Sequence, residues 1–494
     1  MLRIRRLPID THPDNTAFML RHCDGYSAEQ FQALRKIRVS GEDREILATL
    51  ALVDDAKIIG SGEIGLGEQA FRRLGLPEGA EVAIAQARRP ASLEFVRRKI
   101  DGDTLGEAEI AAVIRDISAF RYSPMEIGAF LVACAGFMST PETLALTVAM
   151  VEVGNHLTWD SPLVVDKHCI GGIPGNRTSM IVVPIVAAHG LICPKTSSRA
   201  ITSPCGTADV MEVLANVELS GQQMSEIVAR ESAVLAWGGR MNLSPADDVL
   251  ISVERPLRLD TFEQMVASII SKKVTAGSTH LVIDIPVGPT AKVRTQYDAV
   301  RLRKLFEYVA RHMGLETMIV FTDGSQPVGR GVGPVLEARD VMAVLRNEPD
   351  APEDLRDHAL MLAGHMLDFD PALPGGRGFS RALELLASGE ALKAMERIIA
   401  AQGANPIKPT LGRFRHEVKA NADGAIASID CERIARVARH AGAPMDQGAG
   451  LDLLHKTGSA VRKGDTLYRI YANSETGLGF AREFAEENSG YVIR

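Results

Sequence analysis

Two loops in this sequence concentrate the residue types that bind anions. The first loop, residues 166–179 (DKHCIGGIPGNRTS), places Lys and His before paired glycines and two hydroxyl residues. It lies between SPLVV (161–165), a predicted strand, and MIVVPIVAAHG (180–190), whose apolar length suits a buried helix. A strand-to-helix turn exposes backbone N–H groups at the positive end of the helix, where anions bind. The loop suits a phosphate without being a Walker loop, although an ordinary glycine turn with a solvated lysine would explain the same residues.

The second loop, residues 197–212 (SSRAITSPCGTADVME), follows the predicted strand LICPKT and precedes a helix that begins near Thr207. Its hydroxyl residues surround Arg199 and Gly206; they are Ser197, Ser198, Thr202, Ser203 and Thr207. Serine and threonine are common in loops, so this composition alone proves nothing. Two such loops at equivalent ends of sheet strands nevertheless favour one shared anion site.

A third segment, LDTFEQMVASIISKK (259–273), predicts a helix with functional groups on one flank. Its buried stripe consists of Phe262, Met265, Val266, Ile269 and Ile270. Ser268 and Lys272 are four residues apart and therefore share a flank of that helix.

Alternating strands and helices between residues 163 and 323 must position these groups. The strand-like runs are LVVD, LICPKTSS, SAVLAW, HLVIDIPVG and TMIVFTD. Alternation of this kind predicts a mainly parallel sheet covered by helices, with ligands beyond the carboxyl ends of the strands.

The whole chain of 494 residues predicts a multidomain α/β protein. We expect a small β-rich N-terminal module (1–88), a helical subdomain (89–160), a mainly parallel α/β phosphate- and substrate-binding domain (161–345), and a Gly-rich α+β C-terminal domain (346–494). In the helical subdomain, TLGE (104–107), SPME (123–126) and STPE (139–142) fit the capping box of a helix start.

Composition excludes several classes of protein. The formal charge is 55 − 62 = −7, which argues against a nucleic-acid partner. Six cysteines without paired or metal-ligand spacing predict reduced thiols in a cytoplasmic protein. The chain start lacks the apolar core of a signal peptide, and no apolar run reaches the length of a membrane span. We therefore expect a cytoplasmic protein with no membrane partner.

The second loop resembles the signature of the thymidine phosphorylase family. The matching residues are Ser197-Ser198-Arg199, then Gly206-Thr207-Ala208-Asp209 with Glu212. The first loop resembles the Lys-His-Ser-x-Gly-Gly phosphate loop of that family, and the resemblance covers the chain from about Ser92 to its end. The β-rich N-terminal module, the GIPGNRT form of the first loop, SSRAITSP and WGGRMNLSPADD (237–248) resemble most closely the second subfamily, which includes archaeal AMP phosphorylase.

The resemblance implies a reaction and a set of contacts. Orthophosphate would attack C1′ of a nucleoside or nucleoside 5′-monophosphate, releasing the base and forming a pentose 1-phosphate. By matching positions, phosphate would contact Lys167, Ser179, Ser197 and Thr207. The substrate would contact Gly172, Ser198, Arg199, Ala200, Ile201, Thr202, Ser203, Ser268, Lys272 and Lys292. No metal or organic cofactor is implied, since orthophosphate is a co-substrate, and family members are homodimers or larger homo-oligomers.

Two residues match catalytic positions. Asp260 matches the general acid of AMP phosphorylases, and a departing purine anion needs such a proton. The alternative is that DTFE (260–263) is only a helix cap. His168 would contact the base or be a spectator. Cys169 stands where the family often has Ser, and its thiol is a poor replacement for a phosphate-binding hydroxyl.

The substrate and two rival functions remain open at this point. A 5′-phosphate would need further cationic donors, for which Arg177, Arg199 and Lys292 are candidates, whereas a pyrimidine nucleoside would not. An anthranilate phosphoribosyltransferase-like enzyme would need acidic metal contacts, for which Asp209 and Glu212 are available. A non-catalytic nucleotide-binding regulator would bind without turnover. A biotinyl or lipoyl carrier role for the C-terminal domain is disfavoured because Lys456 lacks the neighbouring Met.

Overall fold

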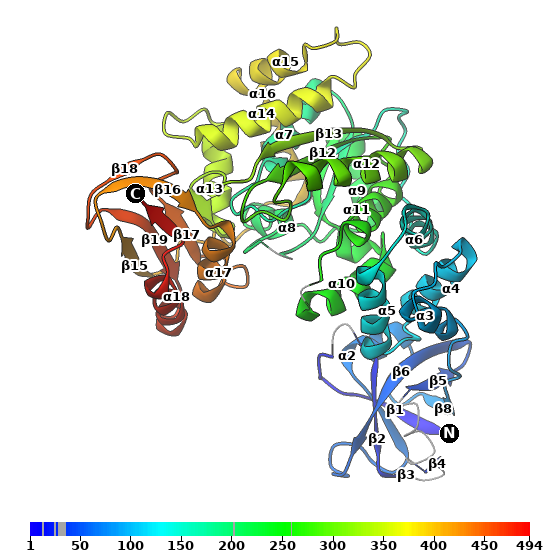
Figure 1. The fold of residues 1–494 in the computed structure, drawn as a ribbon. Coiled ribbons are helices and arrows are strands. Elements are labelled where there is room, and N and C mark those ends of the chain that lie inside the picture. The colour runs from blue at the N-terminus through cyan, green and yellow to red at the C-terminus, as the bar shows by residue number, and fades with distance from the viewer. Residues whose placement is uncertain (12–13, 24–25, 28–35, 201–202, 258) are drawn as a thin grey trace. The chain divides into compact units, whose positions relative to one another are not determined.

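The computed structural model describes the chain except residues 12–13, 24–25, 28–35, 201–202 and 258 (Figure 1). It forms two compact units. Unit 1 comprises Met1–Gly154 and Ser244–Ser268, and unit 2 comprises Asn155–Leu243 and Ile269–Arg494.

Unit 1 begins with a closed β-barrel. Its strands are β1 (Leu2–Arg6), β2 (Thr16–Leu20), β5 (Lys36–Gly41), β6 (Arg44–Val53), β7 (Glu63–Leu66) and β8 (Glu81–Gln86), in the order β1-β7-β2-β6-β5-β8. A short hairpin of β3 (His22–Cys23) and β4 (Tyr26–Ser27) and the helix α2 (Glu68–Leu74) accompany it. Alternate strand residues such as Ile37 and Val39 are buried, as a barrel that packs one face of each strand inward requires.

The rest of unit 1 is a helical subdomain. It contains α3 (Leu93–Ile100), α4 (Glu107–Ser118), α5 (Pro124–Gly136), α6 (Thr140–Glu152) and α10 (Pro245–Leu257), together with the first residues of α11 (Phe262–Thr275). The predicted capping boxes at Ser123 and Ser139 are confirmed. The box predicted at Thr104 is wrong, because α4 starts at Glu107 and Glu109 accepts the N–H of Gly106 instead.

A parallel sheet forms the centre of unit 2. Its strands are β9 (Val165–Cys169), β10 (Cys193–Ser197), β11 (Ala233–Trp237), β12 (His280–Val287) and β13 (Glu316–Asp323). All the pairings β13-β12-β9 and β10-β11 are parallel, and a parallel bridge between Val164 and Ile192 joins the two groups. The mainly parallel α/β domain is thus confirmed. Strand order reverses at β9 and β12, the position where ligands of open α/β sheets bind.

The strand β9 differs from its prediction. The predicted runs SPLVV and LVVD end at Val165 and Asp166, but β9 begins at Val165 and continues through Lys167 and His168 to Cys169. These residues pair with Leu281–Asp284 of β12, so the sheet ladder extends them. Because successive strand residues point to opposite faces, Asp166 and Lys167 project to opposite sides of the sheet.

Helices pack on this sheet well beyond residue 345. The connecting helices are α7 (Ser179–His189), α8 (Thr207–Met211), α9 (Gly221–Glu231), the 3-10 helix η1 (Gly238–Met241) and α12 (Gln296–His312). They are followed by α13 (Pro334–Leu345), α14 (Glu353–Leu367), α15 (Gly378–Ala387) and α16 (Glu390–Gln402). Leu360, Leu386 and Ile398 share one hydrophobic core with Ile181 of α7. The four domain boundaries remain predictions.

The C-terminal part of unit 2 combines two small sheets with two helices. Its strands are β14 (Gly331–Val332), β15 (Phe414–Lys419), β16 (Gly424–Ile429), β17 (Gly450–Leu453), β18 (Ala460–Val461), β19 (Thr466–Ala472) and β20 (Tyr491–Ile493). They form the sheets β14-β17-β19-β15 and β18-β16-β20, packed with α17 (Cys431–Ala441) and α18 (Glu475–Glu487). Lys456 donates to Asp354 and to the carbonyl of Pro327, so it is anchored rather than displayed as a carrier lysine.

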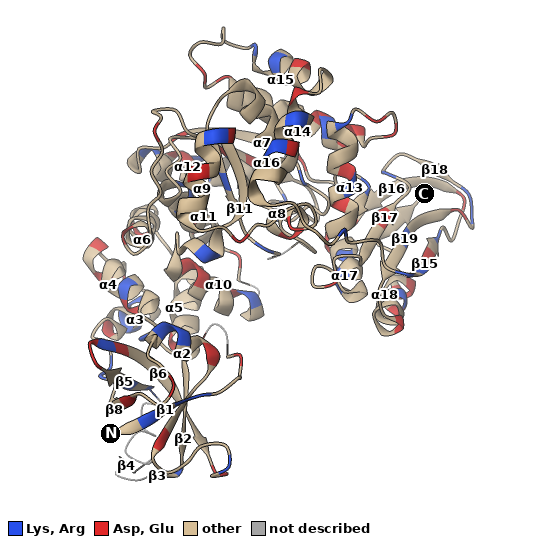
Figure 2. Cartoon of the chain, turned by 180° about the vertical axis from the view of Figure 1, so that it is seen from behind, with Lys and Arg blue, Asp and Glu red and all other residues tan. Residues whose placement is uncertain are grey.

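Charged side chains of both signs are interspersed along individual elements (Figure 2). In the described part of the chain, no helix has the length and apolarity that crossing a membrane would require.

Candidate active site

Glycines shape the first loop where it leaves β9. Gly171, Gly172 and Gly175 have φ values of +88°, +90° and +74°, which side chains rarely adopt. A Cβ on Gly172 would lie 3.0 Å from Cγ and 3.2 Å from the backbone N of Lys292. The structure therefore brings together these two predicted substrate residues, one after β9 and one in the third loop (residues 288–295) after β12.

Lys167 lies at the base of the first loop and is buried, with 1% exposure. Its Nζ donates a 2.6 Å hydrogen bond to Oγ1 of Thr178 and lies 4.0 Å from Oδ2 of Asp284. Burial lowers the pKa of Lys167, and the nearby Asp284 carboxylate opposes that effect. Ser179, the next residue after Thr178, is also buried and begins α7. Lys167 and Ser179, the two residues of this loop that are predicted to bind phosphate, therefore both lie next to Thr178.

On the opposite face of β9, a single aspartate lies close to two buried lysines. Asp166 accepts from Nζ of Lys273 at 2.6 Å and lies 3.3 Å from Nζ of Lys195. One carboxylate therefore faces two buried ammonium groups. Burial, together with Lys273 and Lys195, lowers the pKa of His168 well below its usual value. His168 is consequently neutral at pH 7.

Cys169 ends β9 with a protonated thiol. Burial raises its pKa to about 12, and Nδ2 of Asn176 donates to its Sγ at 3.4 Å. A thiol in this state is a poor nucleophile, so covalent catalysis by Cys169 is disfavoured.

A single carboxylate fixes the shape of the second loop. Oδ2 of Asp209 accepts the backbone N–H groups of Ala200 and Gly206, both at 2.7 Å. A Cβ on Gly206 would lie 2.3 Å from the carbonyl oxygen of Ser198, so only glycine fits this position. Two of the predicted substrate residues, Ile201 and Thr202, lie outside the described residues.

Arg199 belongs to the internal structure of this loop. Its guanidinium lies 3.3 Å from Asp209, 2.7 Å from Glu212 and 3.2 Å from Glu218, and it stacks over Trp237 at 4.9 Å. Hydrogen bonding to Glu212 raises the pKa of Arg199 above its usual range. Carboxylates thus already balance its charge, and its predicted substrate contact remains a prediction. Ser197 ends β10, where its Oγ donates to the carbonyl of Ala236.

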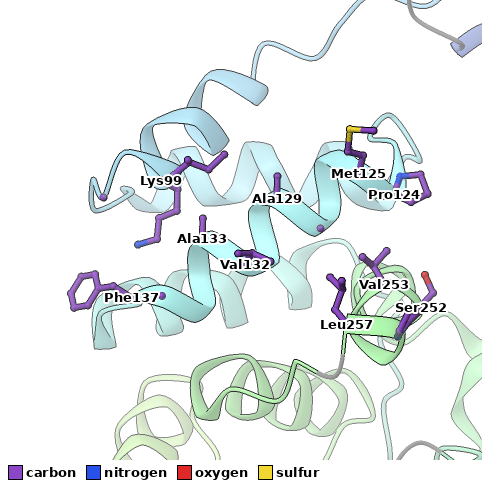
Figure 3. A pocket seen from close by; sticks show the side chains of 15 residues that line it. Lys99, Pro124, Met125, Ala129, Val132, Ala133, Phe137, Ser252, Val253 and Leu257 are labelled. Atoms are coloured by element: carbon purple, nitrogen blue, oxygen red, sulfur yellow. The ribbon is translucent and has the colours of Figure 1, made fainter.

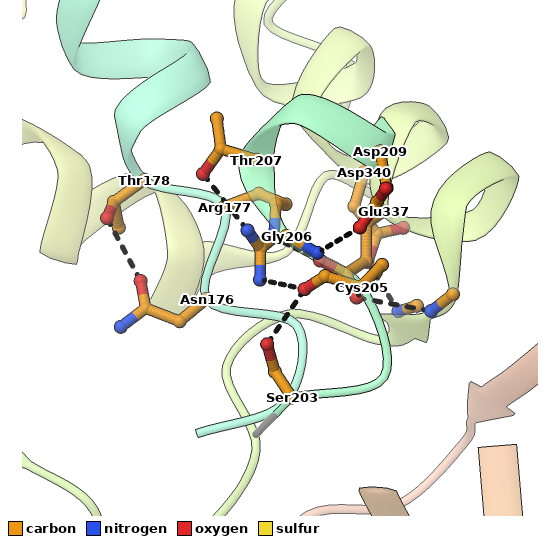
Figure 4. A network of polar contacts seen from close by, with 12 residues as sticks. Asn176, Arg177, Thr178, Ser203, Cys205, Gly206, Thr207, Asp209, Glu337 and Asp340 are labelled. Atoms are coloured by element: carbon orange, nitrogen blue, oxygen red, sulfur yellow. Dashed lines mark hydrogen bonds and ion pairs between the residues drawn. The ribbon is translucent and has the colours of Figure 1, made fainter. Parts of the chain in front are cut away.

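Arg177 joins the first loop to the second (Figure 4). Its Nη1 donates to Oγ1 of Thr207 and its Nη2 to the carbonyl of Cys205, both at 3.0 Å. Its Nε donates to Glu337 of α13, which also accepts from the thiol of Cys205 at 2.8 Å. Sequence reasoning treated Arg177 only as a candidate for a second anion and missed Glu337 and Cys205.

The remaining predicted residues lie on or before α11. Oγ of Ser268 donates to Asp247 at 3.0 Å. Asp260 is exposed. The helix α11 begins at Phe262 and the N–H of Gln264 donates to Oγ1 of Thr261, so Thr261 occupies the cap position that the alternative interpretation gave to Asp260. Asp260 and Ser268 belong to unit 1, whereas Lys272 and the three loops belong to unit 2. Their roles remain predictions.

The helix α17 contacts two of the loops, one at each end. At its start, the N–H of Cys431 donates to Oγ1 of Thr290 in the third loop at 3.0 Å. Near its end, Nη2 of Arg439 donates to the carbonyl of Ser203 in the second loop at 2.9 Å. The C-terminal part of the chain therefore helps to fix both loops.

Comparison with known proteins identifies the family. Residues 161–392 match the model of the glycosyl transferase family a/b domain, residues 93–154 its helical bundle domain, and residues 425–491 the pyrimidine nucleoside phosphorylase C-terminal domain. A "Putative thymidine phosphorylase" of Rhodopseudomonas palustris is 57% identical over 492 residues, which cover 100% of this chain and 96% of the relative. Proteins of the same name from Bradyrhizobium sp. (54%, 100% and 97% covered) and Methylococcus capsulatus (55%, 100% and 96% covered) are also similar. The chain belongs to the thymidine phosphorylase family.

Membership of the thymidine phosphorylase family makes the chain a pentosyltransferase and confirms the resemblance drawn from the two loops. Solved anthranilate phosphoribosyltransferases share the fold. The Thermus thermophilus enzyme has a TM-score of 0.52 at 22% identity, covering 62% of this chain and 98% of its own. The Saccharomyces cerevisiae enzyme, in complex with PRPP and Mg, has a TM-score of 0.51 at 15% identity, covering 64% and 98%. Asp209 and Glu212, the acids that a metal-dependent rival would need, are here bound to Arg199 and backbone N–H groups.

Proposed function

We propose that this protein cleaves the N-glycosidic bond of a nucleoside or nucleoside 5′-monophosphate with orthophosphate. The observation that carries the proposal is the meeting of the first and second loops at the carboxyl ends of β9 and β10. There Lys167 and Thr178, and Arg177 and Thr207, form hydrogen-bonded pairs. The names and domains of the relatives support the same reaction.

The reaction requires that the protein position the two substrates and stabilise their charges, and it does not require a protein nucleophile. An oxygen of orthophosphate forms a bond to C1′ while the C1′–N bond breaks, and its electron pair leaves on the base. The base takes up a proton, and the products are the free base and a pentose 1-phosphate. Lys167, Ser179, Ser197 and Thr207 would hold the phosphate, and electrostatic preorganisation of this kind is a large part of such catalysis.

Asp260 would supply the proton to the departing base. His168, which is neutral, would donate or accept a hydrogen bond at the base. Gly172 and Lys292 would line the sugar side of the substrate, since they lie against one another. Residues 198–203, Ser268 and Lys272 would complete the contacts implied by the family.

The charges around the loops do not single out a nucleoside or its 5′-monophosphate as the substrate. Of the three candidates for a second anion site, Arg177 faces Glu337, and Arg199 faces Asp209 and Glu212. The proposal therefore includes both substrate classes.

A substrate panel tests this proposal. AMP, CMP, UMP, thymidine, uridine and deoxyuridine are incubated with and without orthophosphate, and base release is followed by chromatography. We expect phosphate-dependent release together with an equal amount of pentose 1-phosphate. Release from the monophosphates alone would define a nucleotide phosphorylase, and release from the nucleosides alone a nucleoside phosphorylase. Binding of these compounds without any turnover would contradict the proposal and favour the regulator.

We also propose that the protein is a homo-oligomer, cytoplasmic as its composition predicts, that associates through a groove in unit 1 (Figure 3). The groove, of about 910 Å³, lies between α5 and α10 and is lined almost entirely by apolar residues. Met125 and Phe137 stand at opposite ends of α5 and are 84% and 58% exposed. A contiguous exposed apolar groove is typical of an association site. A second copy suits it because antiparallel packing would place each projecting side chain against the groove of its partner.

Val132, which is 54% exposed in this groove, offers a direct test. Val132→Glu should convert the oligomer to a monomer, because a charge would be buried in the apolar contact. Analytical ultracentrifugation measures the mass of each species. The control is Ile58→Glu, an exposed position on the barrel, which should leave the mass unchanged. An unaltered mass for Val132→Glu would exclude the groove as the contact.

A further inference from the structure

We propose that Arg177 is a positioning residue for orthophosphate, which acts through the hydroxyl of Thr207 and is itself held by Glu337. The inference rests on the proposed function. It adds a residue pair to the reaction and says how one phosphate contact is oriented.

Two segments, the second loop and the helix α13, contact the guanidinium that Arg177 extends from the first loop. Its donors reach the hydroxyl of Thr207, the carbonyl of Cys205 and the carboxylate of Glu337. Both charged side chains are buried, with exposures of 7% for Arg177 and 1% for Glu337. Because the guanidinium is planar and its donors form a rigid fork, its contacts fix the position of one loop relative to the other.

The hydrogen bond from Arg177 also decides which way the Thr207 hydroxyl points. A hydroxyl has one hydrogen to donate, and here its oxygen accepts from Nη1 of Arg177 at 3.0 Å. The hydrogen is therefore directed away from the guanidinium. Within the described residues, this hydroxyl donates to no protein acceptor, which suits it for a phosphate oxygen.

Thr178 shows the contrasting arrangement in the first loop. Its hydroxyl accepts from Lys167 at 2.6 Å and donates to Oδ1 of Asn176 at 2.9 Å. The protein thus satisfies this hydroxyl completely. The threonine that Arg177 orients is the one whose hydrogen is left for a ligand.

Glu337 holds Arg177 through a carboxylate that is buried, and burial disfavours its charged form. The carboxylate also accepts from the thiol of Cys205 at 2.8 Å and from the N–H of Gly333 at 3.1 Å. Burial nevertheless raises its pKa. A buried ion pair of this kind is weak evidence for a stabilising role, whereas a positioning role explains why the pair lies between the two loops.

Steady-state kinetics with varied phosphate and varied substrate test the inference. Arg177→Met should raise the KM for phosphate about tenfold, the effect of losing one charge-assisted hydrogen bond network, while the KM for the substrate changes less than about twofold. Thr207→Val should have a similar effect. In the double variant the two effects should not multiply, because both remove the same contact. Arg177→Lys should restore only part of the affinity, since an ammonium lacks the planar fork.

The matched control is Lys99→Met, which removes the cation of a buried pair in unit 1. It should alter stability without changing the KM for phosphate. Multiplying effects in the double variant, or equal changes in both KM values, would overturn the inference.

A second measurement separates this inference from the proposed function. Added orthophosphate should raise the Tm of the wild type, and this shift should be smaller for Arg177→Met and Thr207→Val. Loss of the shift in both variants supports the inference even if the substrate panel shows no turnover. A shift equal to that of the wild type in Arg177→Met contradicts it even if the panel shows phosphorolysis.

Discussion

Two buried ion pairs in this molecule look alike and behave differently. Lys99–Glu142 lies in the helical subdomain and Arg177–Glu337 in the α/β part, and both carboxylates are 1% exposed. Burial would raise both pKa values. Around Glu142, donors from Leu105, Lys99 and Ser139 outweigh burial and lower the pKa.

The carboxylate of Glu337 has fewer and weaker hydrogen-bond donors to offset its burial. Beside Arg177 it accepts from one backbone N–H and one thiol, a poor donor, and burial keeps its pKa raised. The fold therefore favours the charged form of Glu142 and disfavours that of Glu337, although Glu337 in turn raises the pKa of Arg177. Burial and pairing alone do not tell a structural ion pair from a functional one, but the number and type of the other donors do.

Glu142→Gln should have the largest effect on stability. It removes one partner of a fully buried pair and leaves the ammonium of Lys99 uncompensated. We expect the free energy of unfolding to fall by about 3 kcal/mol, measured by urea unfolding. A loss as small as that of an exposed pair would mean that the donors around Glu142 contribute little.

Glu337→Gln should lower the free energy of unfolding by less than Glu142→Gln does, by about 2 kcal/mol, because Arg177 loses its carboxylate partner but keeps its other acceptors. A raised pKa means that the folded protein favours the neutral form of this side chain, which the amide resembles. The same urea measurement applies. A loss equal to that of Glu142→Gln would remove the distinction between the two pairs.

Acid should affect the two pairs in opposite directions. The pKa of Glu142 is lowered in the fold, so its contribution to stability is present above the unfolded pKa, near 4.3, and is lost as the pH falls through the folded value. The pKa of Glu337 is raised, so its contribution is present below the unfolded pKa and is lost as the pH rises through the folded value. Unfolding of each variant and the wild type from about pH 2 to about pH 8 covers both windows and gives two difference curves, which should slope in opposite directions.

Cys205→Ser should have the smallest effect, a gain of about 0.5 kcal/mol near pH 7. A hydroxyl is a stronger donor than a thiol, so it should lower the pKa of Glu337 towards its usual value. The difference curve for Glu337→Gln, measured in the Cys205→Ser background, should then become flatter. An unchanged curve would show that the thiol contributes nothing to the environment of Glu337.

Much of the fold could be predicted because the signals are local. The five parallel strands are continuous β-rich runs, and the caps at Ser123 and Ser139 have their glutamate partners three residues away. The N-cap at Gly106 was not predicted, because glycine has no side chain that would identify it as a cap in the sequence. The cap at Thr261 was placed one residue too early, since Asp260 and Thr261 both suit that position.

The candidate site was predictable only in part, because some of its contacts join residues that are far apart in the sequence. Ser197, Thr207 and Lys167 stand in recognisable motifs. Arg177 and Glu337 are 160 residues apart, and nothing in either segment predicts the other. The ion-pair partners of Arg199 are more local, because Asp209, Glu212 and Glu218 all follow it within 19 residues.

The contacts of α17 limit how far this protein can be shortened. A fragment that ended before the C-terminal sheets would retain every strand from β9 to β13 and every residue assigned to phosphate. It would nevertheless leave Ser203 and Thr290 without the partners that Arg439 and Cys431 provide. A minimal catalytic fragment therefore has to include α17, even though that helix contributes none of the predicted ligand contacts.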